Sequence, residues 1–222
     1  TLTKAPALAK PATGADSISL VNLAARQRML SQRMILQAVL AAAGSASHLE
    51  AAQKSLQLFC ESQLRLVATA NEVDDVSSRS IKDTYTGPRG VGPLIDNFVQ
   101  HMRTTLQCIA QGDNHTRALS TLVASTDSVL DALNTATTTF DVLSKRKNEQ
   151  MMKELTGIVS SIHTIAREAK IVSFNAQVMA ARAGEHGREF TVVANVLSRI
   201  TNEIDGLSRE AIKLAERNRQ AA

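Results

Sequence analysis

A regular apolar seam in the last third of the chain restricts the folds that this sequence can adopt. Apolar side chains recur there at alternating steps of three and four residues, a spacing typical of coiled-coil helices. The first run consists of Met151, Leu155, Ile158, Ile162, Ile165, Ala169, Val172, Ala176, Met179 and Ala183. The second run consists of Phe190, Val193, Leu197, Ile200, Ile204, Leu207, Ala211 and Leu214. Residues 184–188 (GEHGR) separate the runs and predict a turn, so we expect an antiparallel helical hairpin.

The two arms of this hairpin match in length. A turn centred near His186 places Leu214 opposite Ile158. Two helices packed alone bury too little apolar surface to be stable. Two hairpins side by side would form a four-helix bundle that covers both seams, so the sequence predicts a parallel homodimer.

Four helical segments are predicted before the hairpin. Asp16 and Ser17 can cap a first helix that ends near Ala43, before a Gly-Ser break. A second helix starts near Ser47 and carries a seam of Leu56, Phe59, Gln63, Leu66, Ala70 and Val73. A loop rich in Gly and Pro over 86–93 precedes a third helix over 94–111, and a turn over 112–114 precedes a fourth helix. This order fits an up-down four-helix bundle that ends near residue 145.

The sequence contains no helix breaker between this bundle and the hairpin. Leu143, Lys147 and Met151 stand four residues apart, a stutter that unwinds a supercoil locally without ending the helix. We therefore expect one helix from Thr116 to Ala183, ~100 Å long at the α-helical rise per residue. The predicted class is all-α, with a flexible lead-in over 1–15, a four-helix sensor bundle over 16–145 and a coiled-coil hairpin over 146–222.

Composition agrees with an all-helical protein. Aromatic residues make up 3% of the chain and hydrophobic residues 44%, which suits narrow helix–helix seams better than aromatic-rich β cores. A formal charge of +4 allows contact with nucleic acid or an anionic membrane but does not require either. The sequence has no apolar run long enough to span a membrane, and the first 16 residues lack the hydrophobic block of a signal peptide. We therefore expect a soluble, cytoplasmic protein.

Candidate catalytic and metal-binding groups are sparse. Cys60 and Cys108 lie far apart in apolar helical stripes, as buried thiols do. The five histidines show no ligand spacing, although His101 and Cys108 share a helix face. The loop over 86–93 is not followed by the Gly-Lys-Ser/Thr of a phosphate-binding loop, and no nucleophile–base pattern stands out. We therefore expect no catalytic residues, no metal and no cofactor.

Residues 162–194 read IHTIAREAKIVSFNAQVMAARAGEHGREFTVVA. This segment resembles the signalling tip of methyl-accepting chemotaxis proteins, in register over Asn175, Ala176, Ala180, Ala181, Arg182, Ala183, Gly184, Glu185, Gly187, Arg188, Phe190, Val192, Val193 and Ala194. In that family the tip contacts a histidine kinase and its coupling adaptor. The resemblance implies a partner-binding tip formed by Asn175, Val178, Arg182, Glu185, Arg188 and Phe190.

The tip also departs from the family pattern. Met179, Glu189 and Val196 replace residues of different polarity, so we expect the partner contacts to differ from those of a standard receptor. A hairpin that serves only for dimerisation is the open alternative.

Residues 20–34 read LVNLAARQRMLSQRM. This helix looks like the opening helix of the type IV pili methyl-accepting chemotaxis transducer N-terminal domain (PilJ-type) and of related nitrate/nitrite sensor domains. The matching residues are Asn22, Ala24, Arg28, Met29, Ser31 and Arg33. In the nitrate sensors, the arginine that matches Arg28 reaches an anion shared across the dimer axis, beside a glycine position that Ala25 occupies here. The resemblance implies a nitrate or nitrite site with Arg28, Ala25 and Arg33 as candidate residues.

Helical spacing supports a special role for Arg28. It shares one stripe with the mostly apolar residues Ile18, Val21, Ala25, Gln32 and Ile35. A guanidinium there needs a partner, and its planar fork of donors fits an oxyanion. Two symmetry-related copies would repel each other unless an anion lay between them. A salt bridge from Arg28 to an acidic residue of another helix is the alternative, while Arg33 points ~140° away and Arg26 is expected to be solvated.

The hypothesis from sequence is therefore a homodimeric sensor of a small oxyanion, nitrate or nitrite. It would pass binding through the hairpin to a histidine kinase and adaptor, or to a regulator of nitrate-dependent expression. A dimeric scaffold that senses nothing is a second hypothesis. A basic helical dimer that binds nucleic acid is a third, disfavoured because no recognition helix or basic stripe is apparent.

Overall fold

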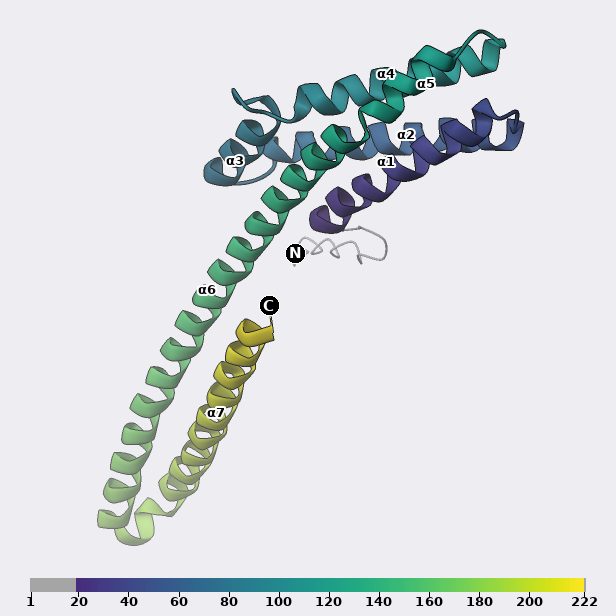
Figure 1. Ribbon diagram of the computed structural model, residues 1–222. Helices are drawn as coiled ribbons and strands as arrows, with labels where there is room; N and C mark the ends of the chain where they lie inside the picture. Colours follow the sequence, from purple (N-terminus) through teal and green to yellow (C-terminus); the bar gives the residue numbers. More distant parts are fainter. Residues whose placement is uncertain (1–18, 222) are drawn as a thin grey trace, which may run out of the picture. The chain divides into compact units, whose positions relative to one another are not determined.

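The computed structural model describes residues 19–221, and this part of the chain contains helices and no β-strand (Figure 1). The all-α class predicted from the sequence is therefore confirmed. The elements follow in the order α1 (Leu20–Ala42), α2 (Ala46–Ala68), the short 3-10 helix η1 (Thr69–Asn71), α3 (Asp75–Thr86), α4 (Gly92–Gln111), α5 (Thr116–Ala124), α6 (Thr126–Arg182), the 3-10 helix η2 (Gly184–Gly187) and α7 (Arg188–Ala221). The predicted lead-in over 1–15 lies outside the described residues.

The chain divides into two compact units. The division falls between Leu143 and Ser144, and α6 contributes residues to both units. Unit 1 contains α1 to α5 and the first part of α6, whereas unit 2 contains the rest of α6, η2 and α7.

The first helix begins later than the sequence predicts. Ser19 is its N-cap, and the Ser19 hydroxyl accepts a hydrogen bond of 3.2 Å from the backbone N–H of Asn22. A serine oxygen at this position satisfies a donor that the helix cannot pair internally. The predicted caps, Asp16 and Ser17, lie outside the described residues.

One apolar core joins the helices of unit 1. Its side chains come from α1 to α4, α5 and the start of α6, with Met34, Phe59, Ile81, Phe98, Leu122 and Leu133 among the most deeply buried. Phe59 and Phe98 meet edge to face, with ring centroids 5.8 Å apart, which joins α2 to α4. Four of the six aromatic residues of the sequence, Phe59, Tyr85, Phe98 and Phe140, are buried in this core.

The helix α3 was not predicted from the sequence. Its segment DVSSRSIKDTYT is polar and buries only Ser77, Ile81 and Tyr85, at steps of four residues. The helix is fixed at its start by Asp74, whose carboxylate accepts hydrogen bonds from the backbone N–H groups of Val76 and Ser77. The cap and the tertiary contacts of three residues therefore outweigh a weak apolar pattern.

The prediction of one helix from Thr116 to Ala183 is wrong, because the helix is interrupted at Ser125 between α5 and α6. The Ser125 and Thr126 hydroxyls donate to the carbonyl oxygens of Leu122 and Val123, each at 2.6 Å. Such local side-chain bonds compete with the helical ladder. Beyond this interruption α6 is continuous to Arg182, through the predicted stutter at Leu143 to Met151.

Unit 2 is an antiparallel hairpin of α6 and α7 held by small side chains. The buried positions follow one another at intervals of seven residues through both arms: Val159, Ala166, Ser173, Ala180, Gly187, Ala194, Thr201, Ser208 and Ala215. Small residues let the two backbones approach closely, and the Ser173 hydroxyl donates to the Ala194 carbonyl oxygen at 2.6 Å. The hairpin predicted from the sequence is present, but a different seam holds its arms together.

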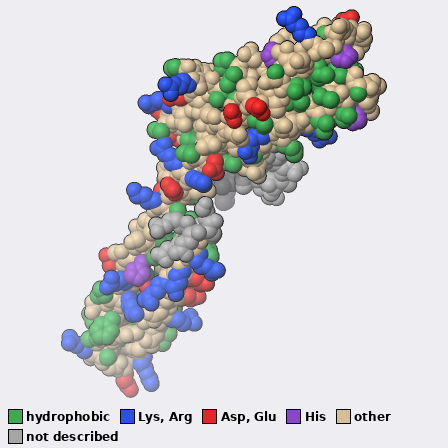
Figure 2. Space-filling view, in the orientation of Figure 1, with side chains coloured by type: hydrophobic (Ala, Val, Ile, Leu, Met, Phe, Trp, Pro, Cys, Tyr) green, Lys and Arg blue, Asp and Glu red, His purple; other side chains and the backbone are tan. Residues whose placement is uncertain are grey.

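The large apolar residues of the predicted seams remain largely exposed in a single hairpin. Ile165 keeps 64% of its surface and Met179 keeps 71%. Leu155, Ile158, Ile162, Val172, Val193, Ile200, Leu207 and Leu214 are also exposed. Apolar side chains accordingly reach the surface of the hairpin in Figure 2.

Candidate anion site and signalling tip

The candidate anion-binding stripe lies beside the face of α1 that enters the core. The core face consists of Leu23, Ala24, Gln27, Leu30, Ser31, Met34, Gln37, Ala38 and Ala41. On the stripe, Val21, Ala25 and Ile35 are half-buried, whereas Arg28 and Gln32 are exposed. Ile18 lies outside the described residues. The core of unit 1 therefore leaves this stripe partly or fully accessible.

Arg28 contacts a neutral amide rather than an acid. Its guanidinium Nη1 donates to the Asn134 Oδ1 atom of α6 at 2.9 Å. The alternative predicted from the sequence, a salt bridge to an acidic residue, is not found for Arg28 among residues 19–221. The contact leaves further N–H groups of the guanidinium fork for another acceptor.

The other two arginines of α1 differ from each other. Arg33 is exposed, and its side chain makes no hydrogen bond or ion pair with the part of the chain that the structure describes. Arg26 is half-buried, and its Nη2 donates to the Ser62 hydroxyl at 3.1 Å. The expectation that Arg26 is solvated was wrong, because α2 packs against that side of α1.

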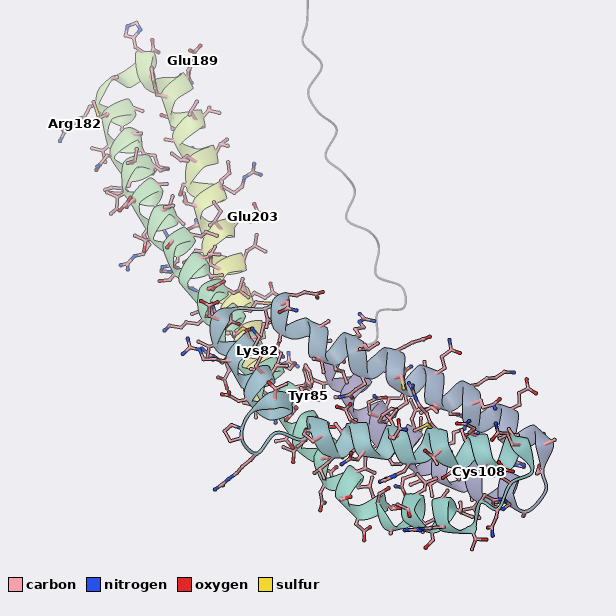
Figure 3. The ribbon with its side chains drawn as sticks, turned by 90° about the horizontal axis from the view of Figure 1, so that it is seen from above. Lys82, Tyr85, Cys108, Arg182, Glu189 and Glu203 are labelled. Atoms are coloured by element: carbon pink, nitrogen blue, oxygen red, sulfur yellow. The ribbon has the colours of Figure 1, made fainter. Side chains whose placement is uncertain are left out.

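Sequence reasoning missed a buried polar cluster next to the stripe. Gln27 is fully buried, and its Nε2 donates to the Phe59 carbonyl oxygen at 2.9 Å and to Gln63 Oε1 at 3.2 Å. Tyr85 of α3, labelled in Figure 3, lies near Gln63, and its hydroxyl makes no hydrogen bond with any described residue. The available signal was the presence of Gln27 and Gln63 within otherwise apolar helical stripes.

Burial of Tyr85 raises the pKa of its phenol to about 12, because the phenolate would lose its hydration. The nearby Gln63 side chain opposes this shift without reaching hydrogen-bond geometry. Tyr85 is therefore a neutral core group at physiological pH.

The six candidate residues of the signalling tip are all exposed. They are Asn175, Val178, Arg182, Glu185, Arg188 and Phe190. Arg182 and Glu189 lie at the end of the hairpin, as Figure 3 shows. The turn is possible because Gly184 adopts a left-handed φ of +59°, and because Gly187 packs against the Ala180 carbonyl oxygen with no room for a Cβ atom.

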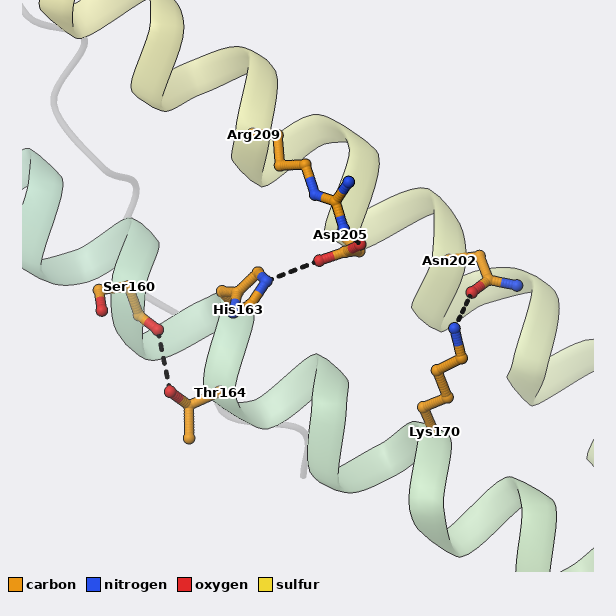
Figure 4. Close-up of polar contacts among 7 residues, drawn as sticks. All are labelled: Ser160, His163, Thr164, Lys170, Asn202, Asp205 and Arg209. Carbon is orange, nitrogen blue, oxygen red and sulfur yellow. Dashed lines mark hydrogen bonds and ion pairs between the residues drawn. The ribbon is translucent and has the colours of Figure 1, made fainter.

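A polar row runs alongside the small-residue seam of the hairpin. His163, Lys170 and Gln177, at seven-residue intervals on α6, each contact a residue of α7. His163 Nε2 lies 2.8 Å from Asp205 Oδ1, and Arg209 contacts the other carboxylate oxygen at 2.6 Å (Figure 4). Lys170 donates to Asn202 and Gln177 to Asn195, each at 2.9 Å. These contacts fix the register of the two arms.

The described residues offer no group of three or more His, Cys, Asp or Glu side chains placed to hold a metal ion. No helix among them is both long and apolar enough to cross a bilayer.

Comparisons with known proteins match both parts of the chain. Residues 16–122 match the family described as type IV pili methyl-accepting chemotaxis transducer N-term. Residues 136–220 match the methyl-accepting chemotaxis protein (MCP) signalling domain. No solved structure matches the chain.

Three curated relatives illustrate the range of similarity. The methyl-accepting chemotaxis protein McpA of Bacillus subtilis is 38% identical over 72 residues, which cover 29% of this chain and 11% of McpA. The biofilm dispersion protein BdlA of Pseudomonas aeruginosa is 34% identical over 61 residues, 28% of this chain and 15% of BdlA. The methyl-accepting chemotaxis protein NahY of Pseudomonas putida is 23% identical over 167 residues, 75% of this chain and 30% of NahY.

The chain therefore spans only a small part of the length of these relatives. The matched families are signal transducers, and no catalytic family is among them. The predicted resemblance is confirmed: a PilJ-type N-terminal domain match over residues 16–122 is followed by an MCP signalling domain match over residues 136–220.

Proposed function

We propose that this protein is a cytoplasmic, homodimeric sensor that binds a small oxyanion, nitrate or nitrite, between the α1 helices of two protomers. Residues 16–145 would act as a four-helix sensor bundle to which α3 is added, and residues 146–222 as the signalling hairpin. Arg28 would hold the anion beside the small residue Ala25, with Arg33 as a further cationic group.

The observation that carries this proposal is the state of Arg28. Its guanidinium is exposed on a stripe flanked by half-buried apolar residues, and its contact within the chain is one neutral amide. A second α1 stripe packed against it would bring two cations together, which is unfavourable until an anion accepts hydrogen bonds from both. Anion binding and one dimer geometry would then be a single event.

The exposed apolar seams of unit 2 support the dimer. Burying a large aliphatic side chain contributes about 1.5–3 kcal/mol, and contiguous exposed apolar surface is typical of an interface. A second hairpin, alongside the first and parallel to it, supplies the same seam in the same register. The exposed tip residues would then contact a histidine kinase and its coupling adaptor, or another regulator.

A thermal-shift series with nitrate, nitrite, chloride and sulfate tests this function. A ligand that binds the native state raises the melting temperature. We expect nitrate or nitrite to raise it in the wild type, Arg28→Ala to abolish the rise, and Arg28→Lys to retain part of it, because a point charge lacks the guanidinium fork. Arg33→Ala should lessen the rise. Arg79→Ala, which removes an exposed guanidinium from α3, is the matched control and should leave the rise unchanged.

Equal shifts in the wild type and in Arg28→Ala would place the site elsewhere. An absence of any shift would favour the non-sensing scaffold. Binding to duplex DNA that weakens steeply with salt would favour the nucleic-acid alternative.

A further inference from the structure

The hydrogen bond between Arg28 and Asn134 joins the candidate anion ligand to the helix that continues into the signalling hairpin. The Asn134 Oδ1 atom accepts from Arg28 Nη1 at 2.9 Å, and both side chains are exposed. Asn134 stands in α6, which extends to Arg182 next to the tip. We propose that Asn134 competes with the oxyanion for the Arg28 guanidinium, and that release of Asn134 is the first change that anion binding causes in α6. This inference rests on the proposed function.

The chemistry of the two acceptors makes the competition directional. An amide oxygen is neutral and takes one hydrogen bond from the guanidinium here. A planar oxyanion carries charge and can accept two parallel bonds from the same fork. An anion bound to the fork that includes Nη1 takes the side of the guanidinium that Asn134 contacts and so displaces the amide, whereas a carboxylate at residue 134 would hold Arg28 as an internal ion pair. A neutral acceptor of this kind keeps Arg28 oriented in the empty protein and still releases it to the ligand.

Threonine hydroxyls bond to the backbone of the α6 segment that follows Asn134. The hydroxyls of four threonines donate to carbonyl oxygens four residues earlier, at 2.7–3.2 Å: Thr135, Thr137, Thr138 and Thr139. Threonines bonded in this way slightly destabilise and often bend helices. The acceptor of the Thr138 hydroxyl is the backbone carbonyl of Asn134 itself.

Contacts just before and within this threonine segment define what a change at Asn134 can move. Leu133 and Ala136 are buried in the core, and the Thr139 hydroxyl contacts the Thr84 hydroxyl of α3 at 2.9 Å. Asn134, the residue of α6 that Arg28 contacts, therefore stands next to residues that the core and α3 hold in place. Losing this contact removes a restraint that α1 places on this threonine segment. Such a change can shift an equilibrium between two helix arrangements only if the anion prefers one of them.

Nitrate titration by calorimetry on the full chain tests the competition. Removal of a neutral competitor worth a typical net hydrogen bond should tighten binding about 2- to 10-fold in Asn134→Ala. Asn134→Asp should weaken it about 10-fold or more, because the new acceptor is charged. Asn97→Ala and Asn97→Asp make the same changes at an exposed asparagine of α4 and should leave the Kd unchanged.

Hydrogen exchange of the backbone amides over residues 135–143 gives a second readout. Nitrate should speed exchange of this segment in the wild type, and Asn134→Ala should exchange at the faster rate without nitrate. A merely structural contact would alter the melting temperature of both variants and leave the nitrate Kd as in the wild type. If the wild type still binds nitrate through Arg28, that result overturns the role of Asn134 and leaves the proposed function standing. A wild type that binds no nitrate, or an Arg28→Ala variant that binds it equally well, overturns the proposed function and this inference with it.

Discussion

The core of unit 1 buries one titratable side chain, the phenol of Tyr85, away from water. Tyr85 keeps 3% of its surface, and burial raises its pKa from the ordinary 10.0 to about 12. A folded-state pKa above the unfolded one means that the stabilisation is complete below pH 10 and is lost as the pH rises toward 12. The free energy of unfolding should therefore fall on the order of 2 kcal/mol over this window.

The alkaline titration of Tyr85 can be observed directly, because it is the one tyrosine of the sequence. Tyrosinate absorbance should rise near pH 12 in the folded protein and near pH 10 in urea. The free energy of unfolding of Tyr85→Phe should lack this tyrosine-dependent fall. A native titration near pH 10 would show that the phenol is hydrated.

The candidate site illustrates what residue patterns can predict. The place of Arg28 outside the core follows from helical spacing, because the stripe at three- and four-residue steps is offset from the buried face by about one residue. Its Asn134 contact joins residues 106 apart in the sequence, and no local pattern encodes such a pairing. The half-buried state of Arg26 was missed for the same reason, since it depends on how α2 lies against α1.

At the scale of the elements, alanine substitutions at two glycines, Gly157 of α6 and Gly187 of η2, are expected to change stability in opposite directions. A Cβ atom at Gly187 would collide with the Ala180 carbonyl oxygen, whereas one at Gly157 would meet no atom within 4 Å. Gly187→Ala should destabilise the hairpin by about 1–3 kcal/mol through overpacking. Gly157→Ala should stabilise α6 by about 0.5–1 kcal/mol, because alanine loses less entropy in a helix.

Urea unfolding of the two variants, followed by circular dichroism at one protein concentration, measures this difference. Equal stability of Gly187→Ala and the wild type would mean that the two arms are not in close contact at the turn.

Element types were easier to predict than their ends. Long apolar seams and the Gly-rich turns indicated α1, α2, α4, α6 and α7, because these signals are repeated over several turns. The helix α3 and the break at Ser125 depend on a few side-chain hydrogen bonds, of Asp74 in one case and of Ser125 and Thr126 in the other. The small residues that close the hairpin were overlooked because alanine, serine and glycine carry little signal in a search for apolar stripes.

At the scale of the whole molecule, the exposed seam of unit 2 predicts self-association. Light scattering should give about twice the chain mass of 23.9 kDa at micromolar concentration. Ile165→Asp should weaken the dimer at least about tenfold, because an unpaired carboxylate would be buried between hairpins. Thr164→Asp adds the same charge one residue away, at an exposed position off the seam, and is the control.

Met179→Glu tests the other end of the seam. Met179 is exposed in a single hairpin, so the substitution should lower the dimer affinity, and any loss of stability should depend on protein concentration. A wild type of monomer mass at micromolar concentration would contradict the dimer. A fall in stability that does not depend on protein concentration would contradict the assignment of Met179 to the interface.

The small residues of both arms recur at one constant spacing of seven residues, and this spacing limits how the hairpin can change in length. The interval passes through the turn without interruption, from Val159 through Gly187 to Ala215. Deletion of seven residues from α6 alone, between His163 and the turn, would return the small residues to the seam but would leave each cross-arm pair beyond the deletion, such as His163 and Asp205, one heptad out of place. Matched deletions of seven residues, one in each arm at the same distance from the turn, would preserve both the seam and the pairing. Insertions and deletions in homologous hairpins are therefore expected to occur in such pairs, so that the arms lengthen or shorten together in units of two helical turns.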